Sequence, residues 1–105
     1  MTKIKFFADQ NGLCGFRVSG HSSLNCDDTE GKIVCSAISS TAFMTANMIC
    51  EIIGDNCEAA VDDALIEINV KNASESSRIA LEGFKLHMTE LSKQYKDRIR
   101  IITEV

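Results

Sequence analysis

Hydrophobic and polar residues alternate near the N-terminus, and this alternation predicts two strands. In KIKFF, Ile4 and Phe6 share one face, and in LCGFRV the residues Phe16 and Val18 share one face. The turn signal DQNG separates the two segments. We therefore expect a β-hairpin closed around Asn11-Gly12.

The middle of the chain carries the patterns of a helix and of a second hairpin. Residues 33–53 contain no charge before Glu51 and are followed by Gly54, which predicts a helix ended by a glycine. The segments CEAAV and ALIEINV flank Asp62-Asp63 and predict two further strands joined by a turn.

A second helix and a last strand complete the pattern. Apolar residues recur at steps of three and four and predict one buried helix face, formed by Leu81, Phe84, Met88, Leu91 and Tyr95. RIRIITEV then predicts a strand with Ile99 and Ile101 on one side. The order ββαββαβ predicts an α+β fold in which one mixed β-sheet is covered by two helices, with residues 1–105 as a single domain. Because there is no GxGxxG or P-loop pattern, a doubly wound nucleotide-binding fold is not expected.

The apolar segment 33–53 is long enough to cross a membrane. It contains several hydroxyl and amide side chains, however, namely Ser36, Ser39, Ser40, Thr41, Thr45 and Asn47. These groups would be costly in lipid without partners, so we expect a buried or dimer-forming helix and no membrane contact. Phe43, Met44 and Met48 give this helix more apolar surface than one small core needs, which favours a homodimer.

Composition narrows the function classes. The net charge is -4, from 11 basic and 15 acidic residues, and no basic cluster stands out, so direct nucleic-acid binding is not expected. The start MTKIKFFADQ lacks the apolar run of a signal peptide, which favours a cytoplasmic location. The 5 cysteines form no CxxC pair, so we expect reduced thiols, with Cys14, Cys50 and Cys57 as small hydrophobic residues.

The polar stretch GHSSLNCDDTEGKIVCSAISS holds a candidate pair of catalytic groups. His21 follows a predicted strand, and Cys35 is expected at or just before the start of the first helix. A helix N-terminus and a neighbouring imidazolium would both favour the thiolate form of Cys35. Backbone N–H groups from Cys35 or Ser36 onward could bind an oxyanion, and His21 could protonate a departing amine. No cofactor is required by this chemistry.

The same stretch resembles a known signature. SGH, a short polar loop and IVCSAIS are similar to the GH pair, the flexible loop and the D-I/L-V-C-A-A/G-V-S segment of the Prp family, the ribosomal-processing cysteine proteases also called YsxB-like proteins. The resemblance extends over the chain length and the order of elements. It implies a homodimeric cysteine endopeptidase that removes an N-terminal extension from a protein of the large ribosomal subunit.

The resemblance also implies residue roles. Gly20-His21 takes the place of the family's GH and supplies the base, Cys35 takes the place of the nucleophile, and Ser39 that of a serine one helical turn beyond it. The loop between them would close over the substrate peptide. Ser36 stands where the family usually has alanine.

Lys32 stands where the family has an aspartate, so the carboxylate of that position must come from another residue. Asp28 or Glu30 could supply the missing carboxylate, and the acidic loop would attract a lysine-rich extension. Lys32 itself would stabilise a thiolate at Cys35. It would also repel a basic substrate, which leaves open a non-catalytic dimeric module that binds peptide in the same groove.

Two other kinds of site remain open. Cys26, also in the loop, could form a disulfide with Cys35 and make the protein redox-sensitive. His21, Cys26 and Cys35, with Asp28 or Glu30, could instead bind a metal ion, although their spacing fits no zinc motif.

Overall fold

The structure is a computed structural model that describes residues 1–23, 25 and 27–104, and within these residues the chain forms five strands and two α-helices. The strands are β1 (Thr2–Asp9), β2 (Gly12–Ser19), β3 (Cys57–Asp62), β4 (Leu65–Val70) and β5 (Ile99–Glu104). The helices are α1 (Thr29–Asn47), which continues into the π-helical turn η1 (Met48–Ile53), and α2 (Glu75–Gln94). The predicted order ββαββαβ is confirmed.

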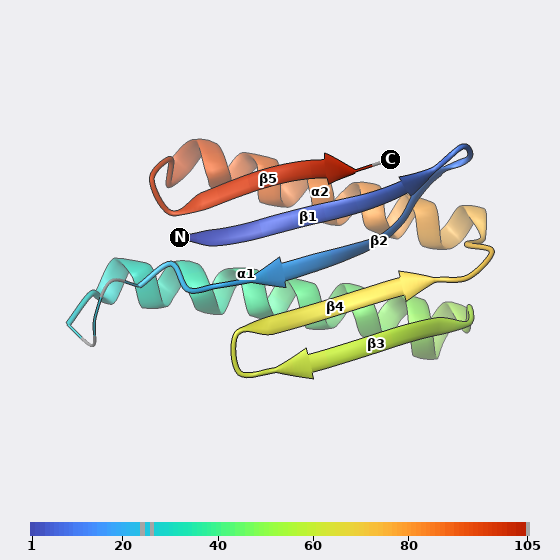
Figure 1. Ribbon diagram of the computed structural model, residues 1–105, viewed down its shortest axis with the longest axis horizontal. Coiled ribbons are helices and arrows are strands. Elements are labelled where there is room, and N and C mark those ends of the chain that lie inside the picture. The colour runs from blue at the N-terminus through green and yellow to red at the C-terminus, as the bar shows by residue number, and fades with distance from the viewer. Residues whose placement is uncertain (24, 26, 105) are drawn as a thin grey trace.

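The strands form one mixed sheet in the order β3-β4-β2-β1-β5. β1 and β5 are parallel, whereas the β1–β2, β2–β4 and β3–β4 pairs are antiparallel. Both helices cover the same face of the sheet (Figure 1). The last strand therefore lies beside the first, and because the two are parallel, the N-terminus and the C-terminus lie at opposite ends of this pair (Figure 1).

The core lies between the sheet and the helices. Alternate residues of the strands point into it, as the sequence pattern predicts, and α2 contributes its predicted apolar face. Phe84 of α2 packs against the rings of Phe6 and Phe16, with ring centroids 5.6 and 4.6 Å apart. The fully or nearly fully buried apolar residues are Ile4, Phe6, Leu13, Phe16, Val18, Val34, Ile38, Ala42, Ile49, Ile66, Ile68, Val70, Leu81, Phe84, Met88 and Ile99.

The two predicted hairpins are present, with small shifts of their turns. The first turn lies at Gln10–Asn11, and Gly12 already belongs to β2 with a φ of 128°. The second turn lies at Asp63–Ala64, one residue later than predicted. Neither shift changes which strand faces reach the core.

The first helix begins earlier than the sequence predicts. Asp28 caps it by accepting a hydrogen bond from the Gly31 N–H at 3.2 Å, so Thr29 is the first helical residue. The prediction that Cys35 lies at or before the helix start is therefore wrong. The residues before Ile33 are polar and therefore have the composition of a loop. They are helical because Asp28 is held by Arg98, a residue far away in the sequence.

The end of the first helical run agrees with the sequence. η1 ends at Gly54, which adopts a left-handed φ of 82° and donates its N–H to the Ile49 carbonyl at 3.0 Å. By length and composition alone, Thr29–Ile53 could span a membrane, a test that core helices of soluble proteins also pass. In this fold α1 buries Gly31, Val34, Ile38, Ala42 and Thr45 against its neighbours.

Two cysteines depart from the prediction of reduced thiols. Cys50 of η1 and Cys57 at the start of β3 form a disulfide, with their Cα atoms 6.2 Å apart. The turn after Gly54 brings the chain back against the last turn of the helix, which places these two residues together. Among the described cysteines, Cys14 and Cys35 carry free thiols.

Candidate active site

A cavity of about 140 Å³ lies where the end of β2, the first half of α1 and the β3–β4 turn meet. The residues that line it are Thr2, Val18, Gly20, His21, Cys35, Ile38, Ser39, Asp63, Ala64 and Ile66. Four of the residues predicted from the sequence, Gly20, His21, Cys35 and Ser39, are thus brought together. An imidazole, a thiol and a hydroxyl share one small, partly enclosed space.

Cys35 reaches the cavity from within α1. It lies six residues after Thr29, so its own N–H and that of Ser36 belong to the regular hydrogen bonding of the helix. The prediction that these two N–H groups are free to bind an oxyanion is therefore wrong. The helix N-terminus is already capped by Asp28.

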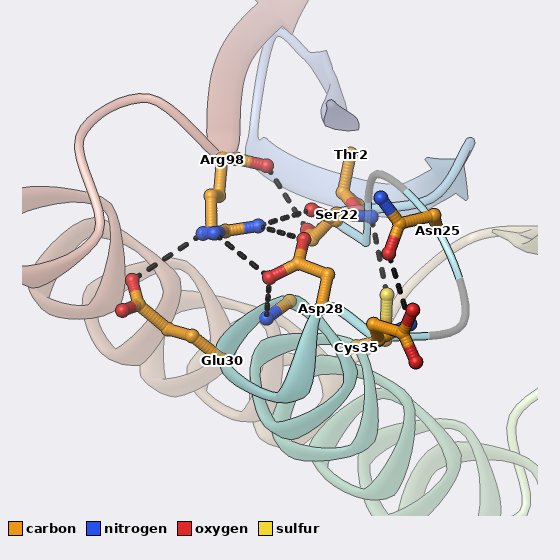
Figure 2. A network of polar contacts seen from close by, with 9 residues as sticks. Thr2, Ser22, Asn25, Asp28, Glu30, Cys35 and Arg98 are labelled. Carbon is orange, nitrogen blue, oxygen red and sulfur yellow. Dashed lines mark hydrogen bonds and ion pairs between the residues drawn. The ribbon is translucent and has the colours of Figure 1, made fainter.

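A different backbone group contacts the thiol. The N–H of Ser22 donates a hydrogen bond to Cys35 Sγ at 3.1 Å, as Figure 2 shows. This bond fixes the position of the sulfur relative to the segment that follows His21. Sequence analysis missed Ser22, because it follows His21 in a stretch with the composition of an ordinary loop.

Gly20 fixes the backbone just before His21. Its φ is 84°, a left-handed conformation that side chains other than glycine rarely adopt. A Cβ at this position would lie 2.7 Å from the Met1 carbonyl oxygen. The Gly20 N–H also donates to the Ala64 carbonyl at 3.1 Å. The sequence predicts Gly20 as a supporting residue of the site. Its positive φ and its close approach to Met1 explain why this position requires glycine.

Asp28 and Glu30 lie on one side of this site, where they bind Arg98 of the α2–β5 connection (Figure 2). Arg98 contacts both carboxylate oxygens of Asp28, at 2.6 and 3.0 Å, and Glu30 Oε1 at 3.3 Å. The hydrogen bonds to Asp28 raise the pKa of Arg98 above its usual value. The two carboxylates that were predicted to orient the base or attract substrate are therefore engaged with this guanidinium.

Three predicted supporting residues lie outside the cavity. Among the described residues that line it, Asp28, Glu30 and Ser36 do not occur. Ser36 and Lys32 are exposed on α1. The part of the chain that the structure describes holds no group of three or more His, Cys, Asp or Glu side chains placed to bind a metal. Cys26 lies outside the described residues, so its redox role stays a prediction.

Comparison with known protein families identifies the family of this chain. The family model of cysteine protease Prp matches residues 1–100. The chain belongs to the Prp family. A Prp protein is a cysteine protease, and the resemblance seen in the GH and IVCSAIS segments is thereby confirmed. A search of the curated proteins returned no match.

Solved structures share the Prp fold over the full chain. The essential ribosomal processing protease Prp from S. aureus, in complex with a covalently linked product peptide, is 16% identical, with a TM-score of 0.86 over 99% of this chain and 100% of that one. The same protease with a substrate peptide is 15% identical, also with a TM-score of 0.86 and the same coverage. SMU.848 from Streptococcus mutans is 18% identical, with a TM-score of 0.81 over 99% of this chain and 96% of that one.

Proposed function

We propose that this Prp protein trims the N-terminal extension of a large-subunit ribosomal protein during ribosome maturation, with His21 and Cys35 as its catalytic dyad. The observation that carries the proposal is the shared cavity of His21 and Cys35, with a backbone N–H bonded to Cys35 Sγ. The choice of substrate is supported by the S. aureus relative, which is a ribosomal processing protease.

The proposed mechanism uses only groups of this chain and water. The Cys35 thiolate, whose sulfur accepts a hydrogen bond from the Ser22 N–H, attacks the carbonyl carbon of the scissile bond. His21 gives a proton to the departing amine, and the C–N bond breaks to leave a thioester on Cys35. His21 then takes a proton from water, which attacks the thioester and releases the new carboxylate and the thiol.

Incubation with the ribosomal protein tests this function directly. The purified protein should convert the N-terminally extended large-subunit protein of the same cell into a single shorter product, followed by mass over time. The same ribosomal protein without its extension is the matched control and should remain unchanged. Tight binding of the extended protein without any cut would contradict the proposal and indicate a peptide-binding module.

We also propose that the protein is a homodimer, formed through the helical layer. An apolar groove of about 430 Å³ lies between α1 and α2, lined by Thr41, Met44, Thr45, Met48, Ala80, Gly83, Phe84 and His87. Met44, which lines the groove, is 59% exposed, and the preceding residue Phe43 is 41% exposed. Covering such a surface with a second copy would remove apolar area from water.

Changing Met44 to lysine should shift the protein from dimer to monomer, because it places an ammonium in this apolar surface. The measurement is molar mass by light scattering on a sizing column. Val61→Lys is the control, since Val61 is also apolar and 61% exposed but lies on the edge strand β3 and does not line the groove. A wild-type protein that is monomeric at high concentration would contradict the proposal.

The proposed location is the cytoplasm, where the ribosomal substrate is made, without direct membrane or nucleic-acid contact. Cell fractionation tests the proposal: recovery of the protein with membranes or with free RNA would contradict it.

A further inference from the structure

Arg98 connects the two ends of the loop that separates His21 from Cys35. At one end, its Nη1 donates to the Ser22 carbonyl oxygen at 2.7 Å. At the other end, Nη1 and Nη2 bind the two carboxylate oxygens of Asp28, the residue that caps α1. One guanidinium therefore fixes both the segment after His21 and the start of the helix that carries Cys35.

The same segment is held from a second side. Ser22 is buried, with 2% of its surface exposed, and its hydroxyl donates to the Arg98 carbonyl oxygen at 3.0 Å. That hydroxyl also shares a hydrogen bond of 2.6 Å with the hydroxyl of Thr2. These bonds determine where the Ser22 N–H points, and it points at Cys35 Sγ (Figure 2).

The geometry of Arg98 matters more than its charge. Its positive charge is paired with the carboxylates of Asp28 and Glu30. The side chains of Arg98 and Asp28 are only 20% and 11% exposed, and a planar guanidinium binds such partners with fixed directions. Gly31 leaves the room for it, since a Cβ there would lie 2.7 Å from Arg98 Nη1.

We propose that Arg98 is a positioning residue for the nucleophile: it holds Ser22 so that the Ser22 N–H stays on Cys35 Sγ and keeps the thiol reactive. This inference rests on the proposed function of Cys35. It predicts that the reactivity of Cys35 depends on a residue that neither contacts Cys35 nor lines the cavity.

The test is the rate at which iodoacetamide alkylates Cys35, followed as a function of pH by mass spectrometry of the peptide that contains it. Arg98→Gln should slow alkylation at neutral pH roughly fivefold, because the hydrogen bond from Ser22 that positions the sulfur is weakened. Arg98→Lys should behave like Arg98→Gln, since an ammonium cannot span Ser22 and Asp28 with the same directions.

Arg78 offers a matched control at the other end of the molecule. It binds both carboxylate oxygens of Asp9, at 3.0 and 3.2 Å, and the Leu13 carbonyl at 3.1 Å, which repeats the contacts of Arg98 far from Cys35. Arg78→Gln should leave the alkylation rate and its pH profile unchanged. Ser22→Ala keeps the N–H but loses the hydroxyl contacts, and it should slow alkylation as well, even if Arg98→Gln fails to fold.

Three results would overturn the positioning role: unchanged alkylation in the Arg98 variants, full rescue by lysine, or equal slowing by Arg78→Gln. Lysine rescue would show that charge alone acts, and equal slowing would show a general loss of stability. Iodoacetamide needs no peptide substrate. If alkylation of Cys35 slows in the Arg98 variants as expected but the wild-type protein cuts no ribosomal protein, only the proposed protease function is contradicted.

Discussion

Replacing Cys35 by alanine is expected to reduce cleavage of the extended ribosomal protein by about 10⁴-fold or more, since the covalent route is lost with the thiol. Binding of the substrate should persist, because the change removes a single sulfur from the wall of the cavity. The measurement is the rate of product formation by mass spectrometry, together with the dissociation constant of the uncut extended protein.

Two other substitutions serve as controls for the Cys35 variant. Cys14 is the other described free thiol, and burial raises the pKa of its sulfur, which disfavours the thiolate. Cys14→Ala should therefore keep wild-type cleavage. Ser36→Ala alters the next residue of α1, which is exposed, and should also keep it. Cleavage by Cys35→Ala at the wild-type rate would mean that another group is the nucleophile.

Changing Gly20 to alanine is expected to lower the cleavage rate by roughly 10²-fold, the loss that a displacement of about 1 Å causes at a catalytic group. The new Cβ would meet the Met1 carbonyl at 2.7 Å, so the backbone must move. His21 follows directly and would leave its place in the cavity. The expected change is mainly in kcat, since the substrate groove keeps its other walls.

Gly54→Ala separates the effect of position from the effect of backbone strain. Gly54 has a φ of 82°, close to the 84° of Gly20, but a Cβ there meets nothing within 4 Å. Both variants should lose about 1 kcal/mol of stability from the positive φ. Only Gly20→Ala should lose activity. Equal cleavage by the two variants would show that the approach of Gly20 to Met1 does not place His21.

Local patterns were sufficient to predict most of the architecture. Alternation placed Ile4, Phe6, Phe16 and Val18 on the buried face, and steps of three and four gave the buried face of α2, because burial on one side leaves a period in the sequence. The signature around His21 and Cys35 likewise identified these two residues, which line the cavity together.

The parts that could not be predicted depend on contacts between distant segments. The first turn of α1 looks polar and irregular in sequence, yet it is helical because Asp28 caps it and binds Arg98, 70 residues away. The Ser22 contacts to Arg98 join residues 76 positions apart, and no local pattern reports them. The same holds for Cys50 and Cys57, which meet only because the chain reverses after Gly54.

The contact between the start of β1 and the start of β5 has a consequence for the order in which the site forms during synthesis. Thr2 donates its N–H to the Arg98 carbonyl at 2.9 Å, and β5 pairs with β1. During synthesis, His21 and Cys35 leave the ribosome well before Arg98 and β5 do. The growing chain thus carries Cys35 for some time without the residue that we propose to position it. During that time, the thiol of a protease made beside its own substrate would be less reactive.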